Sequence, residues 1–313
     1  MVYCSDKMPG GNARNMELRV LKYFLTVARE QSIVKAARSL HLSQPTLSTQ
    51  LKALEKELGK QLLIRGTKGS RKVTLTEEGM ILQKRAEEIL NLVQKAEKEI
   101  FLSDQAIVGD VYIGAGETDA VRFAAKAAKS LRESCPGIHY HIVSGNAEFV
   151  TDQLDKGLID FGMVFGFVDH TKYNSIRIPD KDSWGVLMRK DSPLAAKQVI
   201  TPEELRDKPL ILSSQDKSSG EFAAWIGREL SELDIIATYN LLFNASLMAE
   251  EGLGYAVGLD RIINTAGNCN LCFRPLSPVR EESMSIIWKK YPVFSKASEK
   301  FMEKIKELSS QTD

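Results

Sequence analysis

The sequence predicts an α/β multi-domain chain in three parts: a mostly helical head, one long helix and a C-terminal α/β region of two subdomains. Three observations support this prediction. Apolar residues recur at helical spacing over residues 16–75, a heptad repeat follows over 76–104, and strands alternate with helices over 105–313. Residues 1–15 lack apolar periodicity, so we expect a disordered tail or a remnant ahead of a natural start at Met16.

Length and composition exclude several classes of protein. The chain has 313 residues, enough for about two domains, with 43% hydrophobic and 27% charged residues. Four cysteines are too few for a disulfide-stapled secreted domain. The sequence has no apolar run of about 18 residues and no signal-peptide core at its start. We therefore expect a cytoplasmic protein with no membrane partner.

The net charge of +1 hides an uneven distribution. Residues 1–75 contain 14 basic and 5 acidic residues, a net charge of +9. The remainder contains 28 basic and 36 acidic residues, a net charge of −8. A basic head on an acidic body predicts that the head meets a polyanion such as nucleic acid, with a chance surface imbalance as the alternative.

The head begins with three predicted helices. The first two cover residues 18–28 and 33–40. The third starts at Ser43, a favourable N-cap, has Pro45 in its first turn and ends at Gly59. Its buried face is a stripe of leucines: Leu47, Leu51, Leu54 and Leu58. Two short helices, a tight turn and a third helix with a polar outer face predict a helix-turn-helix.

A basic hairpin, or wing, follows the third helix. Residues 62–65 and 72–75 flank a glycine-containing turn, and no acid interrupts the basic residues there. Polar side chains on the third helix can read bases, and wing cations suit phosphates or a minor groove. The candidates are Gln44, Thr46, Ser48, Thr49 and Lys52 on the helix, and Arg65, Lys68 and Arg71 in the wing. The alternative is a solvated helix beside a charged loop.

Residues 76–102 predict one long helix. Glu77 and Glu78 lie in its first turn, where the helix dipole favours acids. Apolar residues spaced 4, 3, 4, 3 and 4 form an a/d seam: Leu82, Ala86, Ile89, Val93, Ala96 and Ile100. Such a seam needs a partner, so we expect dimerisation with a second copy of the chain. The alternative is a helix that packs on its own domain.

The α/β region divides into two units of similar construction. A βαβαβ order implies a parallel sheet with helices on its faces. We expect subdomain I over about 108–178 and 290–313, and subdomain II over about 179–289. In the first, strands are predicted at 111–113, 138–144 and 159–165, with helices at 120–131 and 147–156. In the second, strands are predicted at 184–189, 209–213, 235–239, 255–259 and 285–288, with helices from 201, at 221–233 and at 245–251. A last helix is expected near 294–308.

The head contains the pattern SQPTLSTQ…LE…LG…L…R…LT..G, which resembles the LysR-type transcriptional regulators. The resemblance covers residues 16–310 and includes four further segments, GDVYIG at 109–114, PGI at 136–138, GLID at 157–160 and GLG at 252–254. It implies a winged helix-turn-helix, a coiled-coil linker helix and an effector domain of periplasmic-binding-protein type. Members are cytoplasmic regulators, not enzymes, and bind double-stranded DNA as homodimers or homotetramers. They respond to a small-molecule effector, and RNA polymerase is a further candidate partner.

The resemblance also bears on individual residues of the head. Gln44, Pro45 and Ser48 match family positions that approach DNA, and Ser43 begins the same motif. Thr49 stands where an arginine is frequent, which puts one phosphate or guanine contact in doubt. Leu63 replaces the usual aromatic residue, and Arg65 keeps the basic wing position.

A cleft between two α/β units is a common place for a small ligand. Free N–H groups at a strand-to-helix turn favour an anion, often a carboxylate. Glu117 departs from that chemistry, because its carboxylate would repel an anion or hold a cation. The candidate effector residues are Gly116, Glu117, Thr118, Gly145, Asn146, Phe165, Gly166, Ser213, Ser214 and Gln215. The alternative at each position is ordinary helix capping.

Four other interpretations stay open at this point. Cys269 and Cys272 form a CxxC that suits a redox switch, although buried or incidental thiols fit better. The segment GAGETDA has a weak likeness to a nucleotide-binding loop of an enzyme. The α/β half alone would suit a solute-binding receptor. His139 and His141 share one strand face and offer two metal ligands at most, so no metal site, catalytic residue or cofactor is predicted.

Overall fold

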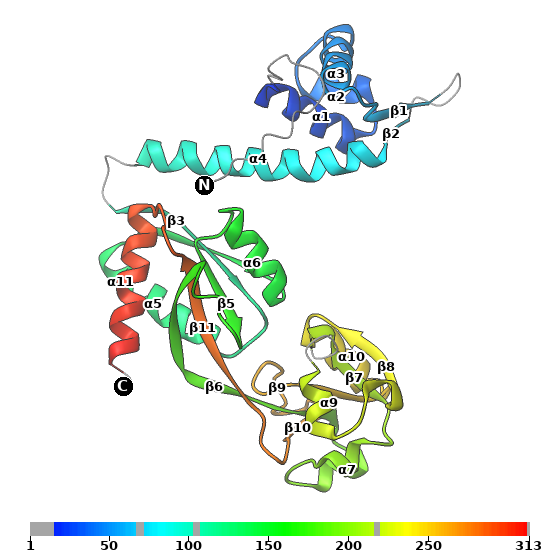
Figure 1. The fold of residues 1–313 in the computed structure, drawn as a ribbon, viewed down its shortest axis with the longest axis vertical. Coiled ribbons are helices and arrows are strands. Elements are labelled where there is room, and N and C mark those ends of the chain that lie inside the picture. Colours follow the sequence, from blue (N-terminus) through cyan, green and yellow to red (C-terminus); the bar gives the residue numbers. More distant parts are fainter. Residues whose placement is uncertain (1–15, 67–71, 103–106, 216–219, 312–313) are drawn as a thin grey trace. The chain divides into compact units, whose positions relative to one another are not determined.

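The computed structural model describes residues 16–66, 72–102, 107–215 and 220–311 (Figure 1). The predicted tail at 1–15 and the wing residues Lys68 and Arg71 therefore lie outside the described residues. The chain forms two compact units, Met1–Lys98 and Glu99–Asp313, and each is described by itself. Across the described ranges, no helix is long and apolar enough to cross a membrane.

The first unit has the predicted helix-turn-helix and wing. Its elements are α1 (Leu18–Glu30), α2 (Ile33–Ser39), α3 (Gln44–Leu58), β1 (Leu63–Arg65), β2 (Val73–Leu75) and the start of α4 (Glu77–Leu102). Ser43 caps α3, because its Oγ accepts the N–H of Thr46 at 3.2 Å. Gly59 ends the helix with φ 66°, a left-handed conformation that costs glycine little.

The predicted leucine stripe of α3 forms the centre of this unit. Leu47, Leu51 and Leu54 are buried with Phe24 of α1, and Leu58 packs against them at the edge. Gly79 lies in the first turn of α4, against the backbone of Leu62, the residue before β1 of the wing. A Cβ at Gly79 would lie 2.2 Å from the carbonyl oxygen of Leu62, so only glycine fits there.

One carboxylate joins the wing to the third helix. Oε1 of Glu55, in α3, accepts the backbone N–H groups of Leu62 and Leu63, each at 3.0 Å. Its other oxygen, Oε2, lies 3.1 Å from Nη2 of Arg65 in β1. Because the Glu55 side chain is only 16% exposed, these bonds are shielded from water and hold the first strand of the wing on α3.

The long helix α4 uses part of its predicted seam inside its own unit. Ala86 is fully buried and packs in one cluster with Leu21 of α1, together with the partly buried Leu82 and Ile89. Ala86 therefore contacts its own chain, which corrects its assignment to a surface shared with a second copy. The later seam residue Ile100 is 75% exposed. The sequence could not separate the two cases, because both need the same apolar periodicity.

The second unit is built on one path of strands that passes through two subdomains. The elements of the first half are β3 (Val108–Ala115), α5 (Val121–Ser134), β4 (Gly137–Ser144), α6 (Ala147–Asp155) and β5 (Phe161–Phe165). β3 pairs in parallel with β4 and β5, as the βαβαβ pattern predicts. β11 (Glu281–Lys289) then adds to β5 in the antiparallel direction, so the sheet is mixed.

Subdomain II repeats the arrangement. Its elements are η1 (Pro193–Ala196), α7 (Pro202–Leu205), β7 (Leu210–Ser213), α9 (Glu221–Ile226), η2 (Leu230–Glu232), β8 (Ile235–Tyr239), α10 (Leu242–Glu250), β9 (Tyr255–Leu259) and β10 (Leu271–Pro275). β7 pairs in parallel with β8 and β9. The predicted helix at 221–233 ends early at Ile226, because Gly227 takes φ 66° and stops it.

The strand β6 (Tyr173–Arg189) joins the subdomains and is longer than expected. Its first part pairs with β11, and its second part pairs with β9 and β10, from Trp184 onward. The sequence predicted a strand only at 184–189, because Pro179 and the charged residues after it are typical of a loop. β6 and β11 run side by side between the subdomains (Figure 1).

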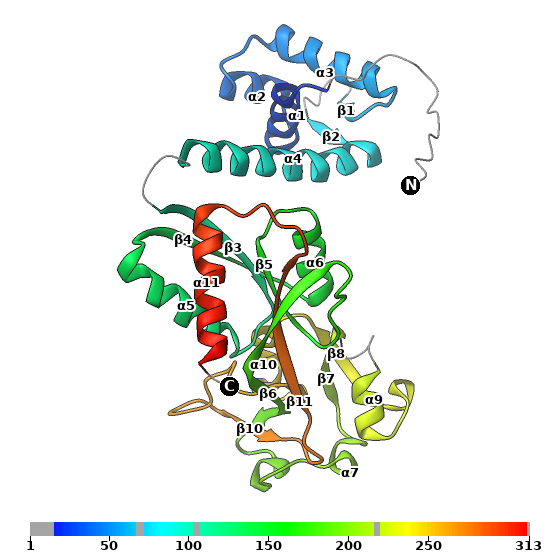
Figure 2. The same ribbon diagram turned by 60° about the vertical axis from the view of Figure 1, so that its left-hand side comes forward.

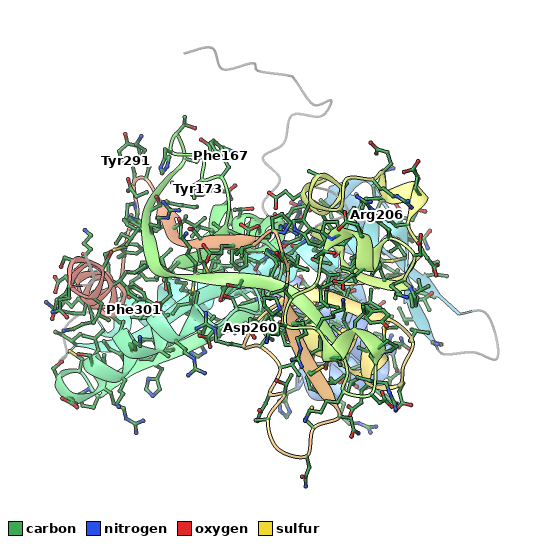
Figure 3. The ribbon with its side chains drawn as sticks, turned by 90° about the horizontal axis from the view of Figure 1, so that it is seen from below. Phe167, Tyr173, Arg206, Asp260, Tyr291 and Phe301 are labelled. Carbon is green, nitrogen blue, oxygen red and sulfur yellow. The ribbon has the colours of Figure 1, made fainter. Side chains whose placement is uncertain are left out.

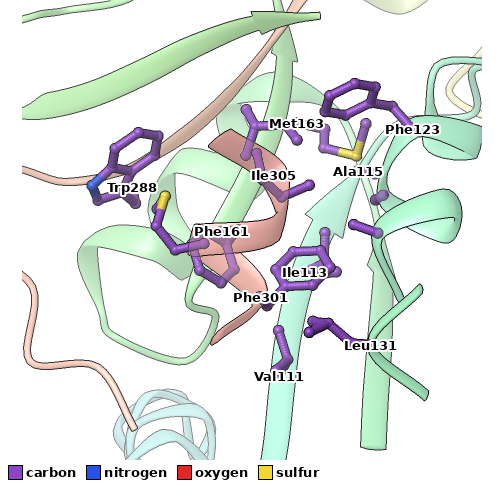
Figure 4. Close-up of a cluster of buried hydrophobic side chains, with 14 of the residues drawn as sticks. Val111, Ile113, Ala115, Phe123, Leu131, Phe161, Met163, Trp288, Phe301 and Ile305 are labelled. Carbon is purple, nitrogen blue, oxygen red and sulfur yellow. The ribbon is translucent and has the colours of Figure 1, made fainter. Parts of the chain in front are cut away.

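Helices cover both faces of the sheet in subdomain I. α5 and α11 (Lys296–Ser310) lie on one face and α6 lies on the other (Figure 2). Under α5 and α11, Phe161, Phe301 and Ile305 are fully buried with Val111 and Leu131 in one cluster (Figure 4). Close packing in this cluster holds the strands of subdomain I in place, and the strands in turn position the loops at their ends.

Two loops of the same subdomain expose aromatic side chains. Phe167 follows β5 and is 91% exposed, and Tyr291 precedes α11 and is 89% exposed. Figure 3 shows both side chains extending from the edge of the domain. Single exposed apolar residues are common on proteins and need no special explanation.

Replacing Glu55 should destabilise the first unit selectively. Glu55→Ala leaves two shielded backbone N–H groups without their acceptor, and we expect a loss of about 2–4 kcal/mol in the stability of that unit. Hydrogen exchange of α1, α2 and α3 in rising urea measures this loss. The three tryptophans Trp184, Trp225 and Trp288 all lie in the second unit, so their fluorescence reports that unit separately.

The matched control is Lys56→Ala, an exposed substitution one position along the same helix. It should change stability by less than about 0.5 kcal/mol. Equal losses in the two variants would show that the Glu55 bonds do not hold the wing.

Candidate DNA interface and ligand cleft

The first turns of α3 present a polar surface. Ser43, Gln44, Pro45, Thr46, Thr49 and Lys52 are exposed and Ser48 is partly buried. The hydroxyl groups of Ser43 and Thr46 lie 2.7 Å apart and share a hydrogen bond in the N-cap. Ser43 and Thr46 therefore stabilise the start of the helix, and Gln44, Thr49 and Lys52 are further exposed polar residues on it.

Two observations change the expected set of basic contacts. Arg65 pairs with Glu55 and is 34% exposed, so its guanidinium is engaged within the unit. Lys35 and Arg38 of α2 are exposed, and the first helix of a helix-turn-helix crosses the DNA backbone. Sequence reasoning did not include these two exposed cations, because they lie before the turn, outside the motif. The available signal was their place on the polar side of a short amphipathic helix.

The second unit contains a cavity between its two subdomains. Its walls come from the carboxyl ends of β3, β4 and β5 on one side and of β7 and β8 on the other. Loops at such strand ends are where ligands bind in open α/β sheets. The volume of the cavity is about 70 Å³.

Most of the predicted effector residues meet at this cavity. The predicted residues in its wall are Gly116, Glu117, Gly145, Asn146, Phe165, Ser213 and Gln215. Asn146 also caps α6, since its Oδ1 accepts the N–H of Phe149 at 2.9 Å. Capping and cavity lining therefore occur together at this residue.

Three predicted residues lie elsewhere. Thr118 is buried and donates its hydroxyl hydrogen bond to the carboxylate of Asp182. Ser214 donates to the carbonyl oxygen of Tyr239 at 3.0 Å. Gly166 takes φ 72° in the turn after β5 and is not part of this wall. The structure thus gives Thr118 and Ser214 other contacts and places Gly166 in a turn.

Sequence reasoning missed the rest of the wall. These residues are Ala147, Met163, Val164, Trp184, Tyr239, Asn240, Leu242, Leu259 and Ile262. Asn240 had a usable signal, because it follows β8 as the predicted residues follow β7. The apolar residues had none, since a side chain lining a cavity and one filling a core have the same local pattern.

Glu117 reaches from one subdomain to the other. It follows β3 in subdomain I, and its Oε2 accepts the N–H of Phe243 at 3.4 Å. Phe243 lies in the first turn of α10, where the helix dipole and unpaired N–H groups favour negative charge. The carboxylate therefore connects the two walls of the cavity.

A second polar contact lies where β6 passes between the subdomains. Asp182, in β6, is 3% exposed and accepts from Thr118 of subdomain I. Arg261 of subdomain II places Nη1 3.2 Å from Oδ2 of Asp119 and Nη2 4.0 Å from Oδ1 of Asp182. Burial raises the pKa of the Asp182 carboxyl, against the opposing effects of the Thr118 bond and the Arg261 charge.

The two cysteines of the CxxC face different cores. Cys272 is buried in the cluster that contains Phe222, whereas Cys269 packs against the cluster of Leu242. Burial also raises the pKa of the Cys272 thiol, which keeps it protonated and unreactive. The structure gives the redox alternative no support.

His141 and Gly114, the first residue of the GAGETDA segment, make contacts within their own subdomain. Nε2 of His141 lies 3.0 Å from Oδ1 of Asp110, and its ring stacks on Tyr112 with centroids 4.6 Å apart. Gly114 is a packing position, because a Cβ there would meet Ile159 at 2.6 Å. Within the described residues, no group of three or more His, Cys, Asp or Glu side chains could hold a metal ion.

The fold and site define a DNA-binding regulator with a ligand-binding domain, and comparison identifies its family. A family model described as "LysR substrate binding domain" matches residues 104–310. Another, described as "Bacterial regulatory helix-turn-helix protein, lysR family", matches residues 18–80. The chain therefore belongs to the LysR family of DNA-binding transcriptional regulators.

Individual proteins show the same organisation. The chain is 29% identical over 285 residues to the Hca operon transcriptional activator HcaR of Escherichia coli (strain K12), covering 88% of this chain and 92% of that one. It is 26% identical over 242 residues to the regulator YvbU of Bacillus subtilis (strain 168), covering 77% and 81%. The crystal structure of CbnR complexed with target DNA has a TM-score of 0.72 at 20% identity, covering 93% and 99%, which shows a shared fold.

Replacing Asp182 with a neutral residue should remove the pH dependence of domain stability that the burial of its carboxyl group creates. Because the folded-state pKa is raised, wild-type stability falls as pH rises through the interval between the ordinary and the raised pKa. Asp182→Asn keeps an acceptor for Thr118 and lacks this titration. We therefore expect the variant to be at least as stable as wild type at neutral pH, and its relative advantage to vanish under acidic conditions.

Urea unfolding followed by tryptophan fluorescence at several pH values measures the effect. Thr118→Val is the companion variant: it removes the hydrogen bond to the charged form and should destabilise the domain most at neutral pH. An Asp182→Asn variant that is less stable than wild type at neutral pH would show that the Arg261 contact outweighs the cost of burial.

Proposed function

We propose that a small molecule bound in the cavity between the subdomains controls how this regulator holds DNA. The supporting observation is that the walls of the cavity come from strand ends of two different subdomains, and that the paired strands β6 and β11 run between those subdomains. A ligand that contacts both walls favours one relative arrangement of the subdomains over others. The coupling then acts through the assembly on DNA.

On the DNA side, we infer that α3 enters the major groove. Gln44 can bind adenine with two hydrogen bonds, and Lys52 is positioned on the same helix to reach a phosphate. Lys35 and Arg38 of α2 suit the adjacent backbone. The carboxylate partner of Arg65 makes it a residue that holds the wing in place, more than a base-reading residue.

We also infer self-association through α4. Ile81 is 65% exposed, Leu92 is 37% exposed and Ile100 is 75% exposed on this helix. An apolar face of this kind is stabilised when a second copy covers it. If α4 joins the helix-turn-helix units of two copies, we expect a roughly palindromic operator. Its half-sites should lie about 34 Å apart, or a multiple of that distance. We further propose that the protein is cytoplasmic and contacts RNA polymerase.

Replacing Gln44 and Lys52 should separate base reading from phosphate binding. A duplex selected from a random library by the full-length protein serves as the probe. Gln44→Ala should lower the preference for that duplex over a base-substituted one by about 5–150-fold. Lys52→Ala should weaken both complexes alike and reduce the slope of log K against log salt by about one. If Gln44→Ala weakened both complexes alike and Lys52→Ala lowered the preference for the selected duplex, the placement of α3 in the major groove would be contradicted.

Filling the cavity should abolish ligand control and spare DNA binding. A Cβ at Gly116 would meet its nearest neighbour, the Gly145 carbonyl oxygen, at 3.6 Å, an ordinary contact, so we expect the longer side chain of Gly116→Leu to occupy part of the cavity that Gly116 lines. The bending of the selected duplex by the protein is measured in the presence of each member of a library of small metabolites. Wild type should respond to at least one compound, and Gly116→Leu to none.

The control is Ala224→Leu, which adds the same carbons at an exposed position of α9. It should behave as wild type in both measurements. A response that persists in Gly116→Leu would place the control of DNA binding outside this cavity.

A further inference from the structure

We propose that the cavity binds a small aliphatic amine, with the ammonium group held by Glu117, and discriminates against carboxylates. This inference rests on the proposed function, because it assigns a chemical class to the ligand of the same cavity.

Glu117 supplies the charge of the cavity. Among the described residues of the wall, it is the one side chain with a formal charge; the others are neutral polar or apolar. The nearby cations Arg122 and Arg261 are both paired with Asp119, at 2.6 Å and 3.2 Å. A carboxylate ligand would therefore lose its hydration and gain a repelling neighbour, with no cation of the described wall to compensate.

One helix N-terminus in the wall, that of α10, is already occupied by a carboxylate. Unpaired N–H groups at a helix N-terminus form a ready anion site. Here the Phe243 N–H at the start of α10 donates to Oε2 of Glu117 at 3.4 Å. An incoming carboxylate would have to displace this side chain and remain beside its charge. An ammonium group can instead bind the same carboxylate without displacing it.

The phenol of Tyr239 is directed to another acceptor, and aromatic side chains lie in the wall. The phenol of Tyr239 donates to the carbonyl oxygen of Val257 at 2.7 Å, so its proton is directed away from a ligand. Phe165, Trp184 and Tyr239 place aromatic rings in the wall, and ring faces attract cations. Trp184 already does so with Arg280, whose guanidinium carbon lies 4.1 Å from the ring centroid. Side-chain oxygens such as that of Asn240 can accept the other ammonium hydrogens.

The volume of the cavity favours a small amine. The cavity measures about 70 Å³, whereas an apolar cavity that admits benzene measures about 150 Å³. The wall residues Met163, Leu242 and Leu259 supply an apolar lining for a short chain. The arrangement therefore suits an ammonium group on a few carbon atoms.

The test compares probes that differ only in their charged group. Propylammonium and butylammonium are paired with propionate and butyrate, and propanol is the neutral member. Isothermal titration and thermal unfolding of the full chain measure binding. We expect the two ammonium ions to bind and to raise the melting temperature, and the carboxylates and the alcohol to have little effect.

Two variants assign the contact. Glu117→Gln keeps the size and hydrogen-bonding capacity of the side chain and removes its charge, and should weaken ammonium binding by at least about tenfold. Glu148→Gln removes a charge from an exposed position in the first turn of α6, outside the cavity wall, and should leave binding unchanged. Equal ammonium affinity in wild type and Glu117→Gln would overturn the assignment.

The remaining outcomes separate this inference from the proposed function. Binding of carboxylates in preference to amines, or binding of neither, overturns the amine assignment. The proposed function is judged independently, by whether Gly116→Leu loses the metabolite response of the DNA complex. If that response is lost while amines do not bind, the cavity is the control site and its ligand belongs to another class.

Discussion

The arrangement of the second unit depends on one pair of antiparallel strands. β6 and β11 pair from Tyr173 opposite Lys289 to Ser183 opposite Glu281, and β6 then continues into subdomain II. Each subdomain builds its parallel strands and covering helices onto this pair. Twisting two paired strands costs little compared with breaking a packed core, so the subdomains can change their relative arrangement while each stays intact. The cavity lies where such a change has its greatest effect.

Charged groups beside these strands contact both subdomains. Arg261 reaches Asp119 and Asp182, and Glu117 reaches the first turn of α10. Each contact lies within about 4 Å, where exposure to water decides its strength. A ligand that competes for Glu117 alters one of these contacts directly. The carboxylate of Glu117 therefore both lines the cavity and contacts the other subdomain, so it connects ligand binding with the arrangement of the subdomains.

The DNA-binding unit uses a carboxylate in a comparable way. Glu55 joins α3 to the wing by accepting two backbone N–H groups and the Arg65 guanidinium. The third helix of the helix-turn-helix and the hairpin beside it are thus held in one geometry. Rigid positioning of this kind is what the proposed base reading by Gln44 requires.

The sequence by itself determined the helices, the wing, the family and most strands, because periodicity, caps and turn residues act over a few positions. The leucine stripe of α3 and the stop at Gly59 are examples. Only the tertiary structure decided that Thr118 bonds Asp182, 64 positions away, and that Glu117 meets Phe243, 126 positions away. It also turned Ala86 inward and joined residues 173–189 into one strand. Contacts over such separations depend on how whole elements pack, and local patterns do not encode them.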